Sequence, residues 1–196
     1  YVQSLLDSGR ARALAEGPCV EFKQADAEAL PFANGSFDVV LSTFGVMFTP
    51  DQNKAAAELM RVCKAGGRIG LANWTPDGFI GQVFKTLGKY LPPPSGVKSP
   101  ALWGTREHLV RLFELEPREI RTEKRHFKFR YRSPLHFLEV FKTYYGPVLK
   151  AFGALDEQKQ KALTADFREL IARLNVADDG TMVVPSEYLE AVIVKQ

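Results

Sequence analysis

The stretch Phe37-Asp38-Val39-Val40-Leu41-Ser42 constrains the fold most, because it is an almost uninterrupted apolar run bounded by turn residues. Such a run is typical of a strand buried on both faces of a parallel sheet. A helical pattern begins at Pro50-Asp51 and ends at Gly66-Gly67, and a second apolar run follows from Arg68 to Trp74. A strand, a helix and a strand at this spacing predict a right-handed parallel crossover and an α/β fold.

The remaining patterns predict further helices and strands around this unit. Helices are expected near residues 4–16, 79–91 and 105–113, and strands near residues 19–23, 118–132 and 188–194. Residues 133–176 carry two apolar helical seams, the first of which should break at Gly146-Pro147 because proline cannot continue a helix. We therefore expect residues 1–196 to form a single domain, with residues 133–176 as a helical insertion or lid before the last strand.

Composition limits the possible partners. The chain has 196 residues, 45% of them hydrophobic, and a net charge of +3, and this mild excess does not predict a nucleic-acid partner. The two cysteines, Cys19 and Cys63, are expected to be reduced and buried. No apolar run approaches the ~20 residues of a membrane span and no signal peptide is visible, so we expect a cytoplasmic protein without a membrane span.

Two further groups of residues each allow a structural and a functional interpretation. A basic strand face is expected to be solvated rather than to bind RNA or an anionic substrate, since no aromatic residues are interleaved on it to stack bases; it comprises Arg121, Lys124, Arg125, Lys128, Arg130 and Arg132. The aromatic stripe from Phe137 to Phe152 is expected to be mainly core, with Tyr144 and Tyr145 as candidate contacts to a substrate. His108, His126 and His136 lack metal-ligand spacing, so no metal site is predicted.

Asp26 has the position of a ligand-binding residue, because it comes just past the end of an expected strand, where open α/β sheets bind their ligands. Its carboxylate can accept a hydrogen bond from an exocyclic amine, while the backbone N–H of Ala27 can donate to a ring nitrogen. Together the two groups would recognise the edge of adenine. Taken alone, an aspartate after a strand is more often a turn residue.

Three motifs in order place the chain near a known family. They are Asp26-Ala27-Glu28-Ala29-Leu30-Pro31-Phe32, Ser36-Phe37-Asp38-Val39-Val40, and Leu59-Met60-Arg61-Val62-Cys63-Lys64-Ala65-Gly66-Gly67. With them the sequence resembles the class I S-adenosylmethionine-dependent methyltransferases, in the branch that includes ubiquinone and menaquinone biosynthesis enzymes. Ala65 stands where that branch usually has proline. The resemblance is good over residues 1–115 and loose beyond, and it implies a Rossmann-like sheet with helices on both faces.

The resemblance implies a cofactor and its contacts. S-adenosyl-L-methionine would bind with adenine at Asp26 and Ala27 and with its methionine portion at Ser42, Thr43 and Phe44. Ser42 and Thr43 have a structural alternative, which is hydrogen bonding at the strand end. The expected activity is methyl transfer to a small, partly apolar molecule, with no residue identifiable as a general base. A non-catalytic or regulatory cofactor-binding domain and a nicotinamide oxidoreductase are the alternatives.

The resemblance also makes an expectation about the start of the chain. Tyr1-Val2-Gln3 fits the residues just after the acid that binds the ribose in this family, and Tyr1 would stack near adenine. We therefore expect the sequence to be N-terminally incomplete, beginning after the glycine-rich cofactor loop, with a central strand missing between those near residues 20 and 40. The strand near residue 20 should then stand apart from the one near residue 38.

Overall fold

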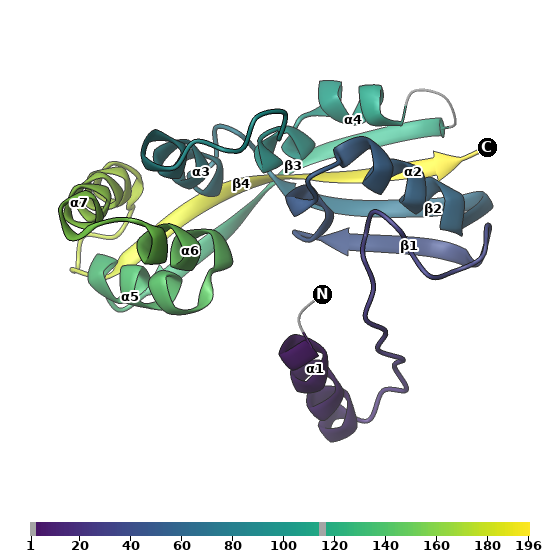
Figure 1. Ribbon diagram of the computed structural model, residues 1–196, viewed down its shortest axis with the longest axis horizontal. Coiled ribbons are helices and arrows are strands. Elements are labelled where there is room, and N and C mark those ends of the chain that lie inside the picture. The colour runs from purple at the N-terminus through teal and green to yellow at the C-terminus, as the bar shows by residue number, and fades with distance from the viewer. Residues whose placement is uncertain (1–2, 114–116) are drawn as a thin grey trace.

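The computed structural model, which describes residues 3–113 and 117–196, contains a four-stranded mixed sheet (Figure 1). The strands lie in the order β1-β2-β4-β3, with bounds β1 Phe37–Thr43, β2 Cys63–Trp74, β3 Pro117–Tyr131 and β4 Met182–Lys195. Strands β1 and β2 are parallel, and β4 runs antiparallel to both of its neighbours. The prediction that strands near residues 38, 70 and 190 share one sheet, the first two parallel and the last antiparallel, is confirmed.

The described residues also form helices, all of which except the first pack on the sheet or on one another. They are α1 Gln3–Glu16, α2 Gln52–Val62, α3 Phe79–Tyr90, α4 Arg106–Leu112, α5 Pro134–Tyr144, α6 Gly146–Ala154 and α7 Glu157–Leu174, with short 3₁₀ turns η1 Val46–Phe48 and η2 Pro100–Gly104. Asp51 and Asp156 cap α2 and α7 by accepting backbone N–H bonds, and Pro147 in the first turn of α6 marks the expected break after α5. Within the two described ranges, no helix is both long and apolar enough to cross a membrane.

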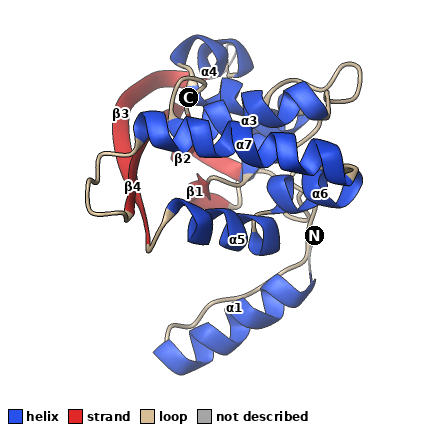
Figure 2. Ribbon diagram, turned by 90° about the vertical axis from the view of Figure 1, so that its left-hand side faces the viewer, coloured by secondary structure: helices blue, strands red, loops and turns tan. Residues whose placement is uncertain are grey.

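The two faces of the sheet are covered unequally near β1. Ile69 and Leu71 of β2 are buried on the face that α2 and α4 cover (Figure 1). On the opposite face Val39 and Leu41 of β1 are 54% and 73% exposed. The expectation that β1 is buried on both faces is therefore wrong, because alternate side chains point to opposite faces and no described element packs on the second. Figure 2 shows that α1 stands apart from the body, and none of its residues is buried.

Strands β3 and β4 continue past the end of β2. Trp74, the last residue of β2, pairs with Tyr188, and beyond this point residues 182–187 of β4 pair only with residues 126–131 of β3. We call this two-stranded segment the overhang. Helix α5 packs on it through the ring of Phe137, whose centroid lies 5.2 Å from that of Tyr131. Helices α3 and α7 contact each other and β4, so the overhang carries the second half of the core.

Two sequence expectations fail in the early part of the chain. Residues 19–23 form no strand, because no described strand lies beside them; the Phe22 carbonyl instead accepts a hydrogen bond from Arg10 Nη2 at 3.1 Å. Accordingly, Val20–Phe22 does not pair with β1. Cys63 is buried as expected, whereas Cys19 is exposed.

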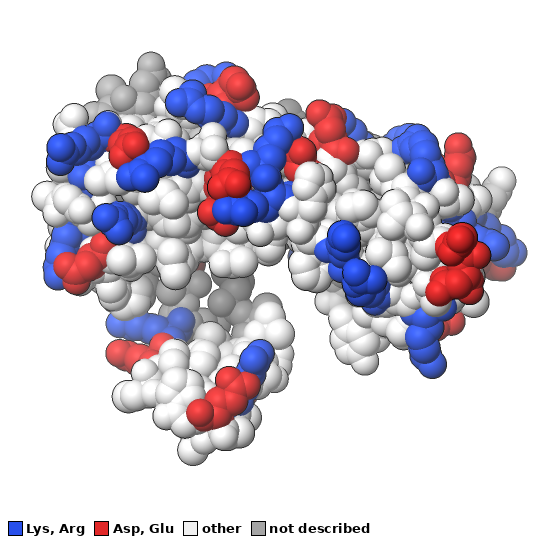
Figure 3. Space-filling view, turned by 180° about the vertical axis from the view of Figure 1, so that it is seen from behind, with Lys and Arg blue, Asp and Glu red and all other residues white. Residues whose placement is uncertain are grey.

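The expected basic face of β3 is divided between the two sides of the sheet. Because strand residues alternate, Arg121 and Arg125 point to the side of Phe127, and Lys124, Lys128 and Arg130 point to the other. Arg121, Lys124 and Arg125 each form an ion pair with a glutamate of β3 or β4. Acidic and basic side chains also lie interspersed over the view in Figure 3.

A clamp between Glu58 and Arg61 of α2 holds the segment that precedes β1. Arg61 donates to both oxygens of Glu58, to the carbonyls of Leu30 and Phe32, and to Asn34 Oδ1. Glu58 in turn accepts the Leu30 N–H at 2.6 Å. The side chains of Glu58 and Arg61 are only 16% and 30% exposed, so the clamp is partly shielded from water. It fixes residues 30–34 against the helix that packs on β2.

The turn after β1 contains a strained residue. Phe44 has φ 52°, and it is the one residue other than glycine with a positive φ in the described ranges. Its ring stacks on Trp74 with 4.0 Å between centroids, and its N–H donates to the Ala72 carbonyl at 2.8 Å. The left-handed conformation costs a non-glycine residue free energy, so the packing of the ring and this hydrogen bond must offset that cost.

The clamp should depend on pH. The hydrogen bond from Arg61 lowers the pKa of Glu58 below its ordinary value of 4.5. A carboxyl whose pKa is lowered on folding stabilises the folded state. This stabilisation is complete above the pKa of the unfolded state and is lost as pH falls through the pKa of the folded state. We expect the protection of the Leu30 amide against hydrogen exchange to fall in that acid range, and Glu58→Gln to lower it by about tenfold already at neutral pH. Asp38→Asn, at an exposed ion pair with Lys64, is the control; unchanged Leu30 protection in Glu58→Gln would contradict the clamp.

The strain at Phe44 predicts an unusual order of stabilities. Phe44→Ala and Phe44→Gly both lose the ring, but only glycine relieves the positive φ. We expect the glycine variant to be more stable than the alanine variant by about 1 kcal/mol in urea unfolding. At Phe48, which lies in η1 without a positive φ, the same pair should show the reverse order. Equal stabilities of the two Phe44 variants would show that the turn is not strained.

Candidate functional site

The segment at Asp26 is a tight turn that leaves two polar groups unused. Asp26 Oδ1 accepts the Glu28 N–H at 2.9 Å, and the Asp26 carbonyl accepts the Ala29 N–H at 3.1 Å. Within the described parts of the chain, Asp26 Oδ2 and the Ala27 N–H make no hydrogen bond. Asp26 therefore does stabilise a turn. Its second carboxylate oxygen, an acceptor, and the N–H of Ala27, a donor, remain available to a ligand.

The end of β1 is held by its own side chains. Ser42 Oγ accepts the Val46 N–H at 2.9 Å, which fixes the start of η1. This is the structural alternative expected for Ser42. Thr43 is exposed, and the Phe44 ring packs on Trp74 and lies edge-on to Tyr188 at 5.5 Å. Of the three residues expected to face the methionine portion, Ser42 and Phe44 thus also serve the turn.

One open cavity brings two of the predicted segments together. Its volume is about 450 Å³, and Ala27 and Ser42 both line it. The other lining residues are mainly apolar and come from the segment before β1, from β1 itself, from the turn after it and from α2: Leu30, Phe32, Phe37, Val39, Val40, Leu41, Gly45, Val46, Leu59 and Val62. Asp26, Thr43 and Phe44 are not among the lining residues, although each is adjacent in sequence to one that is. Tyr1 lies outside the described residues.

The two tyrosines predicted to contact substrate have different surroundings. Tyr144 is 80% exposed, whereas Tyr145 packs on Phe141 with 4.8 Å between centroids. The Tyr145 hydroxyl is buried without a hydrogen-bond partner among the described residues, and burial raises the pKa of Tyr145. Successive ring contacts lead from Phe141 through Phe129 and Trp74 to Phe44. The structure therefore links Tyr145 to the strand end through other rings and does not place it beside Ser42.

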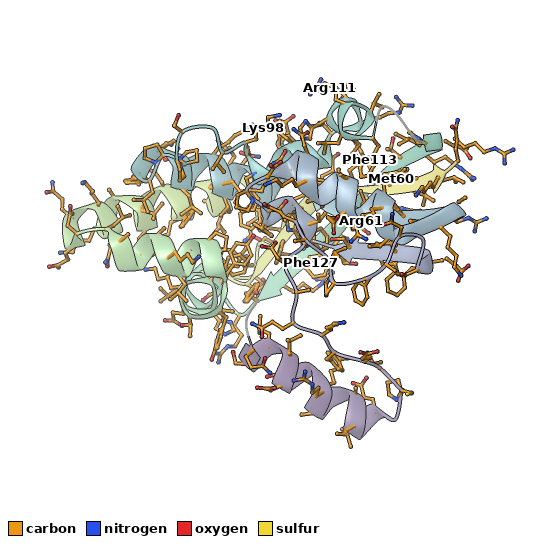
Figure 4. All side chains as sticks on the ribbon, turned by 45° about the vertical axis from the view of Figure 1, so that its right-hand side comes forward. Met60, Arg61, Lys98, Arg111, Phe113 and Phe127 are labelled. Atoms are coloured by element: carbon orange, nitrogen blue, oxygen red, sulfur yellow. The ribbon has the colours of Figure 1, made fainter. Side chains whose placement is uncertain are left out.

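A larger cavity was not anticipated from the sequence. It has a volume of about 680 Å³ and lies between α2, the end of α4 and the start of β2. Met60, Arg61, Arg111 and Phe113 line it and are labelled in Figure 4. Arg61 is already bound in the clamp to Glu58. The (i, i+3) spacing of Glu58 and Arg61 was the available signal for the clamp, whereas nothing in the sequence indicated which backbone carbonyls Arg61 would reach.

Comparisons with known proteins identify the first part of the chain. Residues 1–71 match the family model described as a methyltransferase domain. An uncharacterized protein of Mycobacterium tuberculosis is 39% identical over 164 residues, which cover 83% of this chain and 60% of the relative. A second protein of the same organism is 34% identical, over 91% of this chain and 66% of the relative. The chain thus spans about 60–66% of the length of these relatives.

Named relatives and solved structures agree with this match. Demethylmenaquinone methyltransferase of Thermus thermophilus is 34% identical over 119 residues, which cover 60% of this chain and 54% of that protein. The crystal structure of a protein of Bacillus halodurans described as a candidate methyltransferase has a TM-score of 0.61 at 19% identity, covering 99% of this chain and 80% of that one. The crystal structure of the YcgJ protein of Bacillus subtilis has a TM-score of 0.58 at 17% identity, covering 100% of this chain and 80% of that one. These two structures show the shared fold, and the match over residues 1–71 shows that the first part of the chain is similar to the methyltransferase domain family.

Proposed function

We propose that the protein binds S-adenosyl-L-methionine and transfers its methyl group to an oxygen, nitrogen or carbon nucleophile on a small, partly apolar molecule. The observation that carries the proposal is the cavity of about 450 Å³ at which Ala27 and Ser42 meet. These residues come from two separate motifs, and the cavity lies along β1 and reaches its carboxyl end, where open α/β sheets bind ligands. The unused Asp26 Oδ2 and Ala27 N–H fit the donor and acceptor atoms of an adenine edge.

The residues proposed as cofactor contacts are Asp26, Ala27, Ser42, Thr43 and Phe44. When bound, the cofactor supplies an activated methyl group on its sulfonium. The protein would contribute orientation: the Ser42 hydrogen bond and the Phe44–Trp74 stack hold the strand-end turn in one conformation. Rate acceleration by holding two reactants in line requires no general base, and we assign none. Calorimetry with S-adenosylmethionine and S-adenosylhomocysteine tests binding, and formation of S-adenosylhomocysteine with a panel of acceptors tests turnover.

Asp26 is the sharpest test of the cofactor site. If its carboxylate accepts the adenine amine, Asp26→Ala should weaken S-adenosylhomocysteine binding by about 1.5–3 kcal/mol, the size expected for a hydrogen bond to a charged group. Asp26→Asn retains an oxygen that can accept the Glu28 N–H, so it separates the loss of charge from the loss of the turn. Asp38→Asn serves as a control at an exposed carboxylate paired with Lys64. Equal affinity in all variants would remove Asp26 from the site.

Tyr144 and Tyr145 remain proposed contacts to the acceptor, and a matched pair of variants tests them. Tyr145→Phe removes a buried hydroxyl without a partner, so the free energy of unfolding should stay constant or rise by up to about 1 kcal/mol. Tyr144→Phe, at an exposed position, should leave it unchanged. If the hydroxyls contact the acceptor, methyl transfer should fall while cofactor affinity stays within about a factor of two. Unaltered transfer in both variants would end the assignment, and a loss of stability in Tyr145→Phe would reveal a hydrogen-bond partner.

A further inference from the structure

We infer that Phe127 is a specificity-determining residue, whose half-exposed ring binds an uncharged, planar ring system of the methyl acceptor. The inference rests on the proposed function and adds to it the chemical class of the acceptor and a residue that selects it. No motif of the sequence singled out Phe127 for this role. Its place in the sheet, its ring contacts and the charges beside it carry the argument.

The register of the sheet places Phe127 just past the carboxyl end of β2. Trp74, at that end, pairs with Tyr188, and Tyr188 pairs with Arg125. Phe127 is two residues further along β3, at the start of the overhang and opposite Ser186. Side chains two apart on a strand share a face, so Phe127 lies on the face of Trp74 and Tyr188. In Figure 4 its label lies near the middle of the view, below those of Arg111, Phe113 and Arg61.

The Phe127 ring is the exposed end of a line of aromatic contacts. It lies edge-on to Trp74 at 6.4 Å and to Phe129 at 4.9 Å between centroids. Trp74 is 7% exposed and stacks on Phe44 at the end of β1, whereas Phe127 is 50% exposed. Single exposed apolar residues are common and need no explanation. Phe127 differs because packing fixes its ring beside the strand end while part of the ring stays open to a ligand.

The charges beside Phe127 favour an uncharged ligand. Arg125, two residues before it on the same face, lies 2.8 Å from Glu123 and 3.9 Å from Glu190. Because Arg125, the cation two residues away on the same face, is already paired with these carboxylates, an anionic acceptor that drew on it would have to displace these contacts. An apolar ring can instead bury area against Phe127 in the edge-to-face or offset geometry that aromatic pairs prefer.

The test uses 2-naphthol as the planar probe and decahydro-2-naphthol as its saturated counterpart. Binding of each to the purified protein is followed by ligand-observed NMR, with and without S-adenosylhomocysteine. We expect 2-naphthol to bind more tightly than the saturated alcohol, and Phe127→Ala to weaken its binding by about five- to tenfold, as loss of one aromatic partner and its contact area requires. Phe127→Tyr retains the ring and should retain affinity, whereas Phe127→Leu retains apolar area alone and should not. Leu135→Ala, at a position 62% exposed at the start of α5, is the control for loss of an exposed apolar side chain.

The outcomes separate this inference from the proposed function. Binding of S-adenosylhomocysteine together with equal 2-naphthol affinity in the wild type and Phe127→Ala would overturn the role of Phe127 and leave the cofactor site intact. Undetectable 2-naphthol binding, or equal binding of the two alcohols, would also overturn it. Loss of affinity in Phe127→Ala without any binding of S-adenosylhomocysteine would support the ring site and refute the proposed function.

Discussion

The Glu58–Arg61 clamp is the interaction on which the arrangement of the candidate site depends. Residues 17–36 contain no helix or strand, so their backbone groups must find partners outside a ladder. One guanidinium reaches two carbonyls and a side-chain amide of this segment, and one carboxylate accepts its Leu30 N–H. Because both side chains stand on α2, which packs on β2, the turn at Asp26 is connected to the sheet through a helix. The Asp51 N–H also donates to Glu28 Oε1 at 2.7 Å, so the clamp and this hydrogen bond together fix Ala27 relative to Ser42.

A second set of contacts supports the other side of the site. The Phe44–Trp74 stack joins the turn after β1 to the last residue of β2, and the rings of Phe127 and Phe129 extend it onto the overhang. The clamp acts through directional hydrogen bonds between charged groups and backbone, while the ring cluster acts through buried apolar area. Polar contacts therefore position the segment proposed to bind adenine, and apolar contacts shape the region proposed for the acceptor.

Local patterns were enough to predict most helices and strands. Asp51 indicated a helix start, Gly146-Pro147 indicated the break between α5 and α6, and the apolar run at residues 37–42 indicated β1. What failed depended on partners distant in the chain. Residues 19–23 alternate like a strand, yet a strand needs a ladder, and none is beside them. The apolar run of β1 was interpreted as burial on both faces, although one face has no cover among the described residues.

The candidate site was predictable to a smaller extent than the fold. The motif at Asp26 and the strand end at Ser42 could be found because they are contiguous in sequence. The hydrogen bonds from Arg61 join residues 27 to 31 positions apart in the sequence. The contact between Trp74 and Phe127 joins residues of two different strands that are still further apart. Such contacts follow from topology, which periodicity alone does not specify. The basic residues of β3 were predicted to share one face of the strand. That prediction ignored the alternation of a strand, in which neighbouring residues point to opposite faces.

The position of β4 has a consequence for how the protein acquires its fold. β4 is formed by residues 182–195, yet it lies between β2 and β3 and pairs with both. During synthesis the β1–α2–β2 unit and β3 therefore emerge long before the strand that joins them. Until β4 inserts, β2 and β3 each present an unsatisfied edge, and the most distant pairings must form last. Such high contact order predicts slow folding and a period in which the unfinished sheet is exposed to pairing with other chains.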